Sequence, residues 1–372
     1  MRTLLALLTG LFILGCQPAP ESADSFASSA DSVFLEHPEF AGVVLVADQG
    51  RPIYVRAFGQ RDQDRGLNND TTTVFELASV SKQFTSMIIM MLKEEGKLTY
   101  EDSLGTYIPG LPYPGITIRH LLTHTSGLPD YQAVMDEHWD KNQVAGNADI
   151  IAYLKKYHPD RRFTPGERYE YSNTGYVMLG TIAEVASGQD FIALCRERIF
   201  KPVGMTATDI RTLEEKAAVE NFAKGYVYVP DSGRYVPANR FPSSNYIVWL
   251  GNRKGPGRVS STAADLLKWD RALYSTSLIK KETLEEAFTP FRLNNDSLSR
   301  YGFGWMLQEH PTLGRKIWHT GSNPGYSTRI VRFVDADKTY IVLSNNAYPK
   351  ITRLDRALDS LLSLRVAAGQ AH

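Results

Sequence analysis

Segments with strand character stand at both ends of this 372-residue chain, and segments with helical character fill its middle. Residues 41–48 and 52–58 have the composition of strands, and Gln49-Gly50-Arg51 between them predicts a tight hairpin. Residues 316–319, 326–334 and 338–344 have the same character near the other end. The simplest assembly is one antiparallel sheet of about five strands, built from both chain ends and flanked by helices.

The middle of the chain predicts a mostly helical lobe inserted between the two groups of strands. Helical patterns occupy 117–124, 149–157, 174–187 and 263–274, and a hairpin pattern lies at 225–236. A C-terminal helix is predicted at 352–364. We therefore expect an α+β fold with an α/β lobe of about 32–100 and 295–372 and a helical lobe of about 101–294. A cleft is expected between the two lobes.

The composition excludes partners that depend on strong charge. The chain has 41 Lys and Arg residues against 41 Asp and Glu residues, so its formal net charge is zero. No basic field attracts it to nucleic acid, and no polybasic tract attracts it to anionic lipid. A hydrophobic content of 43% is enough for a substantial core. A small or uncharged partner fits this chain better than a nucleic acid.

The first residues have the form of an export signal. Arg2 precedes an apolar run at 4–14 that is too short to span a bilayer. The run ends in Ile13-Leu14-Gly15-Cys16, which resembles the bacterial lipobox, where cleavage precedes a cysteine that becomes lipidated. We expect 1–15 to be a lipoprotein signal peptide, Cys16 to carry lipid, and 16–31 to be a flexible tether. The protein would then be exported and lipid-anchored to the bacterial cell envelope, on the periplasmic side. An ordinary signal peptide with a chance cysteine is the alternative.

Ser79-Val80-Ser81-Lys82 places a hydroxyl one helical turn before an amine. Roughly one or two Ser-x-x-Lys matches are expected by chance in a chain of this length, and a second one runs from Ser277 to Lys280. Helix phase separates the candidates. Apolar residues at 84, 87, 88, 91 and 92 form one helix face, while Ser79 and Lys82 share the opposite face. Because Ser81 points into the apolar face and Ser277 lies in a charged stretch, Ser79 is the candidate nucleophile.

Two further motifs could contribute to the same site. Tyr171-Ser172-Asn173 follows a turn signal and precedes a helical pattern, so we expect an extended loop on which Tyr171 and Asn173 face the same side. His319-Thr320-Gly321-Ser322 ends a predicted strand, where glycine permits the close approach of a substrate or another backbone. Taken singly, Tyr171 could be a loop aromatic, Asn173 a helix cap and His319 a structural histidine.

In this order the three motifs make the chain resemble the serine β-lactamase and penicillin-binding protein superfamily. The closest likeness is to its class C branch, which includes D-aminopeptidases, DD-carboxypeptidases and esterases. Three further stretches support the likeness, at 120–129, 257–262 and 301–305. The resemblance covers about 40–346 and implies a β-lactamase/transpeptidase-like fold and a serine hydrolase that works through an acyl-enzyme. We expect no cofactor.

The resemblance also implies roles for three side chains. Ser79 attacks a carbonyl carbon, Lys82 takes or relays its proton, and Tyr171 relays a proton and later activates the deacylating water. A free tyrosine is about 0.1% ionised at pH 7, and a shift of three pKa units requires about 4 kcal/mol. One ammonium about 4 Å away, at an effective dielectric constant near 20, supplies a comparable amount. We therefore expect a Tyr171 phenolate beside a Lys82 ammonium, titrating as a coupled pair.

The remaining site residues follow from the same resemblance. Asn173 would orient Lys82 and the substrate amide. The backbone N–H groups of Ser79 and Ser322 are the expected oxyanion hole. The strand residues His319-Thr320-Gly321 would bind the substrate.

One position departs from the family pattern. Many members have lysine where His319 stands, a permanent cation that holds a substrate carboxylate, whereas an unperturbed histidine is only about a quarter protonated at pH 7. We therefore favour an esterase or a D-amino-acid peptidase or carboxypeptidase, with a substrate that could be derived from peptidoglycan. A true class C-like β-lactamase is the alternative. A hypothesis of another class is a penicillin- or peptidoglycan-binding lipoprotein that is acylated without turnover.

Other reactive residues have ordinary structural explanations. His120 and His124 have the spacing of a zinc pair, but the glutamate of His-Glu-x-x-His is absent, and we expect no metal site. Cys195 lies in a helical pattern and is expected to be a small buried hydrophobe. An α/β-hydrolase is disfavoured because no Gly-x-Ser-x-Gly occurs.

Overall fold

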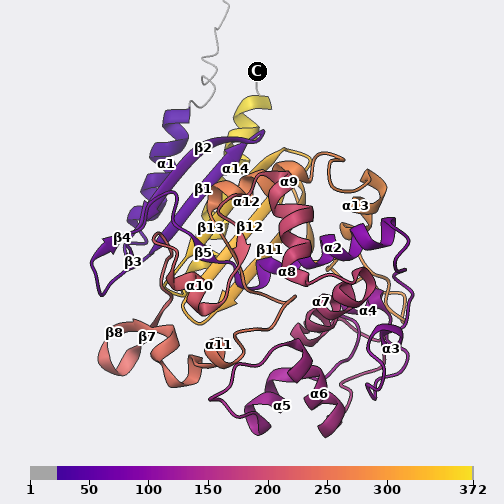
Figure 1. Ribbon diagram of the computed structural model, residues 1–372. Coiled ribbons are helices and arrows are strands. Elements are labelled where there is room, and N and C mark those ends of the chain that lie inside the picture. The colour runs from indigo at the N-terminus through magenta and orange to yellow at the C-terminus, as the bar shows by residue number, and fades with distance from the viewer. Residues whose placement is uncertain (1–22, 371–372) are drawn as a thin grey trace, which may run out of the picture.

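A six-stranded sheet forms the centre of the molecule (Figure 1), which is a computed structural model describing residues 23–370. The predicted signal peptide and the predicted lipidation site at Cys16 lie outside the described residues. The strand order is β10-β11-β12-β13-β1-β2. These strands are β1 (Gly42–Asp48), β2 (Arg51–Phe58), β10 (Met306–His310), β11 (Gly314–Asn323), β12 (Tyr326–Phe333) and β13 (Lys338–Ser344).

The two ends of the chain meet inside this sheet. β1 pairs antiparallel with β13, from Gly42 opposite Ser344 to Asp48 opposite Lys338. The other neighbouring strands are also antiparallel. The expected antiparallel sheet built from both chain ends is therefore confirmed, with six strands where about five were expected. The unexpected strand is the edge strand β10, whose partly exposed residues lack the apolar alternation of a half-buried strand.

Helices cover both faces of the sheet. Along β1, Val43 and Leu45 enter one hydrophobic core, while Val44 and Val46 enter the other. The helices α1 (Ala23–Leu35) and α14 (Ile351–Gln370) pack against the second face. The helices α2 (Lys82–Glu94) and α12 (Ala263–Ala272) belong to the first core.

The expected flexible tether at 16–31 is wrong for its second half, because α1 begins at Ala23. Phe26 and Ala30 are fully buried, and Phe34 is 4% exposed. These residues are spaced by four and form a stripe that packs onto the sheet and α14. The sequence does not reveal this stripe, because its two aromatic members are eight positions apart and are separated mainly by Ser and Ala residues.

Most of the inserted region lies on the far side of α2 from the sheet, where Figure 1 shows α3 to α7 grouped together. The predicted helices and the predicted hairpin of this region are all present. However, α12 packs against β1 and β13, so the predicted helical lobe of 101–294 is wrong for 263–272. The remaining helices are α3 (Leu104–Tyr107), α4 (Ile118–Leu122), α5 (Tyr131–His138), α6 (Asn147–Tyr157), α7 (Asn173–Ser187), α8 (Phe191–Cys195), α9 (Lys201–Val203), α10 (Leu213–Ala217), α11 (Tyr246–Trp249) and α13 (Lys281–Ala287). The short strands are β3 (Gln60–Asp62), β4 (Leu67–Asn68), β5 (Phe75–Glu76), β6 (Asp209–Ile210), β7 (Tyr226–Val229), β8 (Arg234–Pro237) and β9 (Val259–Ser261).

The helix α2 lies between the sheet layer and the inserted helices, and every residue from Lys82 to Leu92 is buried. Its N-terminal end therefore meets both layers. Cys195, on α8, is fully buried, as expected of a small core hydrophobe. Within 23–370, no single helix is long and apolar enough to cross a membrane, although α7 and the segment Phe191–Val203 pass that test jointly as a pair bent by 84°.

Candidate active site

Ser79 lies in a short 3₁₀ turn, Ala78–Ser81, immediately before α2. Ala78 has a φ of 49°, a left-handed conformation that is uncommon for alanine and that stores strain beside the serine. The neighbouring hydroxyl of Ser81 is 1% exposed and accepts a hydrogen bond from the backbone N–H of Val259. Ser277 is exposed in a loop. The structure therefore separates Ser79 from both other serines in the way that helix phase indicated.

The amine of Lys82 is the centre of the site. It is fully buried and lies 3.1 Å from Ser79 Oγ, 2.8 Å from Asn173 Oδ1 and 2.8 Å from the carbonyl oxygen of Pro256. The amine also lies over the ring of Tyr171, 4.8 Å from its centroid. Among residues 23–370, no carboxylate lies within ion-pair distance of this amine. Four segments that are distant in the sequence thus converge on one nitrogen.

The three contacts suit either charge state of Lys82, and burial favours the uncharged one. Burial lowers the pKa of Lys82 well below its ordinary value, and the positive charge of Arg253 lowers it further. A neutral amine has two N–H bonds and one lone pair. Because a side-chain amide oxygen and a backbone carbonyl can only accept, the two N–H bonds point to Asn173 and Pro256. The lone pair then faces the hydroxyl of Ser79, which donates to it.

Tyr171 is also uncharged in this environment. The residue is 37% exposed, but its hydroxyl end is desolvated and lies close enough to Ser79 for that hydroxyl to influence its pKa. Burial raises the pKa of Tyr171 above its ordinary value, although the neighbouring Ser79 hydroxyl acts in the opposite direction. The expected pair of a Tyr171 phenolate and a Lys82 ammonium is therefore wrong in its charges. Desolvation favours the neutral form of both groups.

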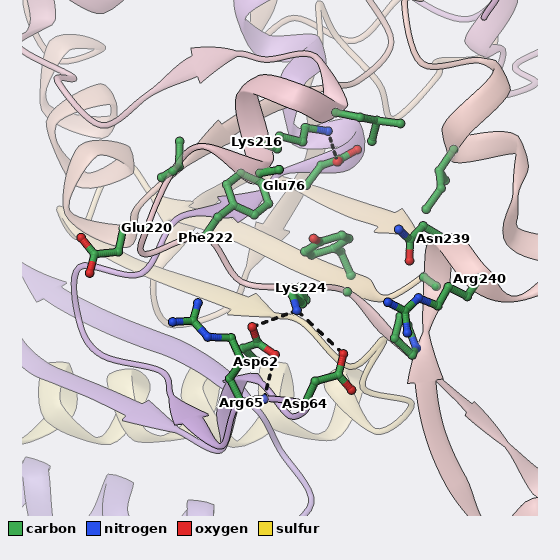
Figure 2. A pocket seen from close by; sticks show the side chains of 18 residues that line it. Asp62, Asp64, Arg65, Glu76, Lys216, Glu220, Phe222, Lys224, Asn239 and Arg240 are labelled. Atoms are coloured by element: carbon green, nitrogen blue, oxygen red, sulfur yellow. Dashed lines mark hydrogen bonds and ion pairs between the residues drawn. The ribbon is translucent and has the colours of Figure 1, made fainter. Parts of the chain in front are cut away.

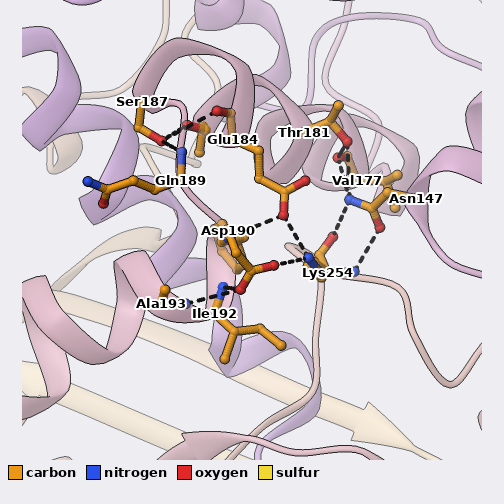
Figure 3. A network of polar contacts seen from close by, with 12 residues as sticks. Asn147, Val177, Thr181, Glu184, Ser187, Gln189, Asp190, Ile192, Ala193 and Lys254 are labelled. Atoms are coloured by element: carbon orange, nitrogen blue, oxygen red, sulfur yellow. Dashed lines mark hydrogen bonds and ion pairs between the residues drawn. The ribbon is translucent and has the colours of Figure 1, made fainter.

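The carbonyl of Pro256 is held in place by a network of polar contacts around the 252–257 loop (Figure 3). The backbone N–H of Lys254 donates to Asn147 Oδ1 at 2.8 Å, and its amine binds Glu184 at 2.7 Å and also Asp190. Thr85 Oγ1 donates to the carbonyl of Gly255 at 2.7 Å. The loop is thereby tied to α2, α6 and α7 at once.

Gly255 is required for the approach of this loop. Its φ is 104°, and a Cβ atom placed there would lie 2.0 Å from the carbonyl oxygen of Tyr176. Sequence reasoning missed Pro256 as a site residue, because its contribution is a backbone carbonyl that any residue could supply. The run Gly255-Pro256-Gly257 was the available signal, since it marks a chain segment of special geometry.

The strand β11 runs past the serine turn. β10 pairs only with residues 314–318 of β11, so the same edge of β11 is free from His319 to Asn323. Gly321 packs directly on the turn, because a Cβ atom there would lie 2.1 Å from the carbonyl oxygen of Leu77. Ser322 is exposed and Thr320 is partly exposed beside it. The predicted strand residues therefore lie along the serine turn, with a free backbone edge.

His319 is buried, at 1% exposure, and uncharged. Its Nδ1 lies 2.6 Å from the carbonyl oxygen of Thr320, which can only accept, so Nδ1 carries the proton. Its Nε2 therefore accepts a hydrogen bond from the hydroxyl of Tyr301 at 2.8 Å. Burial, the largest cause, lowers the pKa of His319 to about 3. The expected partial protonation at pH 7 is wrong, and His319 provides no cation for a substrate carboxylate.

A second histidine, His124, packs against Tyr171 and binds the backbone of the next residue. It is fully buried, its Nδ1 accepts from the backbone N–H of Ser172 at 3.1 Å, and its ring centroid lies 4.3 Å from that of Tyr171. His120 instead uses its Nδ1 to accept from the backbone N–H of Thr117. The two histidines with zinc-pair spacing thus bind different segments: His120 caps the start of α4, and His124 binds the loop that carries Tyr171. Sequence reasoning missed the role of His124 in holding the Tyr171 loop.

A cavity of about 300 Å³ lies beside the segment that leads to Ser79 (Figure 2). Glu76 and Lys216 form a buried ion pair in its wall. Glu76 also accepts from the side chain of Asn323 at 2.8 Å. This contact joins the end of β11 to the chain three residues before Ser79, and it fixes the two backbone segments from which the expected oxyanion hole would be made.

Comparisons with known proteins agree with this geometry. A protein-family model described as Beta-lactamase matches residues 30–363. Penicillin-binding protein 4* of Bacillus subtilis (strain 168) is 43% identical over 312 residues, which cover 83% of this chain and 69% of that protein. The octameric penicillin-binding protein homologue from Pyrococcus abyssi superposes with a TM-score of 0.78 at 28% identity, covering 90% of this chain and 77% of that one. EstCE1, a hydrolase with promiscuous acyltransferase activity, shares the fold with a TM-score of 0.75 at 20% identity, covering 92% and 99% of the two chains.

The charge state of His319 can be tested by NMR. Because its pKa is lowered to about 3, its ring should stay neutral, with the proton on Nδ1, throughout the pH range from 5 to 8. Ring ¹⁵N and ¹³C shifts should therefore stay constant over this range, with the His319→Gln spectrum assigning the signal. A titration midpoint between pH 5 and 8 would contradict the buried, neutral His319.

Proposed function

Because the chain belongs to the β-lactamase family of serine hydrolases, we propose that Ser79 is its nucleophile and that it hydrolyses an ester or amide through an acyl-enzyme, as in the class C branch. The observation that carries the proposal is the set of contacts around the Lys82 amine. Two acceptors fix its N–H bonds and leave the lone pair for the hydroxyl of Ser79. A serine is a weak nucleophile unless such a base stands beside it.

Acylation follows from this arrangement. Ser79 Oγ bonds to the substrate carbonyl carbon as its proton passes to Lys82, which becomes an ammonium. The oxyanion is stabilised by the backbone N–H groups of Ser79 and Ser322. The bond to the leaving group then breaks. Tyr171 gives its hydroxyl proton to the leaving oxygen or nitrogen and regains a proton from Lys82, which is neutral again.

Deacylation uses the same groups in reverse. Tyr171 takes a proton from water and passes its own to Lys82, so that hydroxide attacks the acyl carbon. The second tetrahedral intermediate collapses when Ser79 Oγ leaves with a proton from Lys82. No charged base is needed at the start of either step, which agrees with the buried surroundings of both side chains.

Esters and peptide-like amides fit the site better than β-lactams. The neutral His319 leaves β11 without the permanent cation that holds a β-lactam carboxylate in many family members. A peptidoglycan-derived peptide is a candidate substrate, since the relative at 43% identity is a penicillin-binding protein. A class C-like β-lactamase and an acylated protein without turnover remain as alternatives, and the same experiment separates them.

Intact-mass spectrometry with a fluorophosphonate tests the nucleophile. One adduct is expected on the wild type and none on Ser79→Ala, whose ester hydrolysis should fall at least about 1,000-fold. Ser81→Ala and Ser277→Ala are matched controls that should keep the adduct, because both hydroxyls lie away from Lys82. An equal adduct on Ser79→Ala would refute the assignment.

The same samples test the substrate class. Hydrolysis of short-chain aryl esters is expected to exceed hydrolysis of nitrocefin, and efficient turnover of nitrocefin alone would favour the β-lactamase alternative. A penicillin adduct that persists for hours, without ester turnover, would favour the binding protein.

For the location of the enzyme, we propose export and lipid anchoring through Cys16 at the periplasmic side of the envelope. Expression in a bacterial host with labelled palmitate should label the wild type and the Cys195→Ala control, but not Cys16→Ser. Equal labelling of Cys16→Ser, or its presence in the membrane fraction in wild-type amounts, would contradict the anchor.

A further inference from the structure

Arg253, in the 252–257 loop, is a buried cation with an incomplete set of partners. It is 9% exposed. Among residues 23–370, its guanidinium has one hydrogen bond, from Nη1 to the hydroxyl of Tyr131 at 3.0 Å. Its Nε is buried without a partner. No carboxylate of the described residues lies within ion-pair distance of it. Of its five N–H donors, one binds Tyr131 and that of Nε is buried without a partner, while Nη2 is not among the buried unpaired atoms and reaches the surface.

Such a guanidinium is costly, because a buried charge is destabilising unless it is paired and hydrogen-bonded. Two arginines of the sheet do have carboxylate partners. Arg332, 1% exposed, binds Asp270 at 2.6 Å, and Arg329 binds Asp355 at 2.8 Å. Arg253 lacks such a carboxylate. Arg258, 6% exposed, also has none within ion-pair distance among residues 23–370, but it donates to the carbonyl oxygen of Arg211, whereas Arg253 leaves its Nε unpaired. The missing partner points to an anion that arrives from outside the chain.

Arg253 lies close to the catalytic amine. Arg253 stands three residues before Pro256, whose carbonyl binds Lys82, and its positive charge lowers the pKa of Lys82. Its partner Tyr131 accepts at the hydroxyl and donates its backbone N–H to Thr174 Oγ1, next to Asn173. The guanidinium is therefore part of the wall that runs from Asn173 through Tyr131 to the 252–257 loop.

The buried carboxylate on which Arg253 acts electrostatically is not available to compensate it. Glu76 is already ion-paired with Lys216 and accepts from Asn323. Arg253 and Arg258 both lower the pKa of Glu76, after Lys216, so three cations act on this one carboxylate. Glu76 is therefore already shared with Lys216 and Arg258 and does not pair with Arg253.

The acyl part of the substrate is the part that faces this wall. Tyr171, which serves the leaving group in the proposed mechanism, lies among His124, Tyr301 and His319, with ring centroids 4.3, 6.4 and 6.3 Å away. The 252–257 loop approaches Lys82 through Pro256 instead. We therefore assign the group that remains on Ser79 to the side of the 252–257 loop.

We propose that Arg253 binds a carboxylate carried by the acyl part of the substrate, so that the enzyme prefers acyl groups derived from dicarboxylic acids or from peptides with a free side-chain or terminal carboxylate. This inference rests on the proposed function, because it concerns the acyl group that Ser79 accepts. It is a different site from the family position occupied by His319, which is neutral here.

A matched pair of aryl esters tests the preference. 4-Nitrophenyl hexanoate and mono-4-nitrophenyl adipate have acyl chains of the same length, and only the adipate ends in a carboxylate. The wild type should prefer the adipate in kcat/KM. In Arg253→Met the ratio of adipate to hexanoate should fall at least about tenfold, mainly through KM, as expected for loss of a charge-assisted hydrogen bond. Arg253→Lys should retain part of the preference.

Three controls make the outcome specific. Arg240→Met removes an exposed arginine from the rim of the cavity in Figure 2 and should leave the ratio unchanged. 3-Carboxyphenyl hexanoate carries its charge on the leaving group, and its rate relative to phenyl hexanoate should not depend on Arg253. If Arg253→Met does not fold, the wild type still gives a test: glutarate should inhibit hexanoate hydrolysis competitively and more strongly than butyrate does.

Several results would overturn the inference. A wild type with equal kcat/KM for both esters and no greater inhibition by glutarate would do so. An equal loss for both esters in Arg253→Met, with a displaced pH profile, would mean that Arg253 acts only on the charge of Lys82. These results differ from a failure of the proposed function, in which the wild type hydrolyses neither hexanoate nor adipate and forms no adduct at Ser79.

Discussion

The burial of one amine without a carboxylate partner is the constraint on which the site depends. Lys82 lies at the start of a helix that is buried on all sides, between the sheet and the inserted helices. An ammonium there would need a counter-charge, and the described residues provide none within ion-pair distance. Neutral acceptors surround the amine instead, from Asn173 and Pro256. Lys82 is therefore a buried base that is uncharged at the start of the reaction, and it faces the hydroxyl of Ser79.

Much of the surrounding structure keeps those acceptors in place. The 252–257 loop can present its carbonyl only because Gly255 passes over α7 without a side chain and because Lys254 is anchored by Glu184 and Asn147. The sheet brings β11 beside the serine turn by pairing both chain ends through β1 and β13. His319 and Tyr171 are neutral for the same reason as Lys82, since burial disfavours the charged form of each. The three groups around Ser79 are thus uncharged, and Arg253 is a cation close to them.

The sequence predicts the parts of this site that local periodicity records. Helix phase distinguishes Ser79 from Ser81, and the strand-like composition of β1, β12 and β13 predicts the sheet. Local periodicity does not predict contacts made by backbone atoms, or contacts between residues that are distant in the sequence. The carbonyl of Pro256 and the bond from Tyr301 to His319 depend on tertiary packing, and so do the protonation states, because burial cannot be read from residue type. The charges on Lys82 and Tyr171 were mispredicted for this reason.

The protonation state of Lys82 tests the central claim most directly. In protein labelled with ¹³C at lysine Cε, the Lys82 signal can be assigned by its loss in Lys82→Met and followed from pH 6 to 11. Because its pKa is lowered from 10.5, the amine should be neutral at pH values where exposed lysines are still ammonium ions, and its shift at pH 8 to 9 should be that of a free amine. A Lys82 signal that titrates together with the exposed lysines would contradict the account and restore a charged lysine beside an ionisable tyrosine.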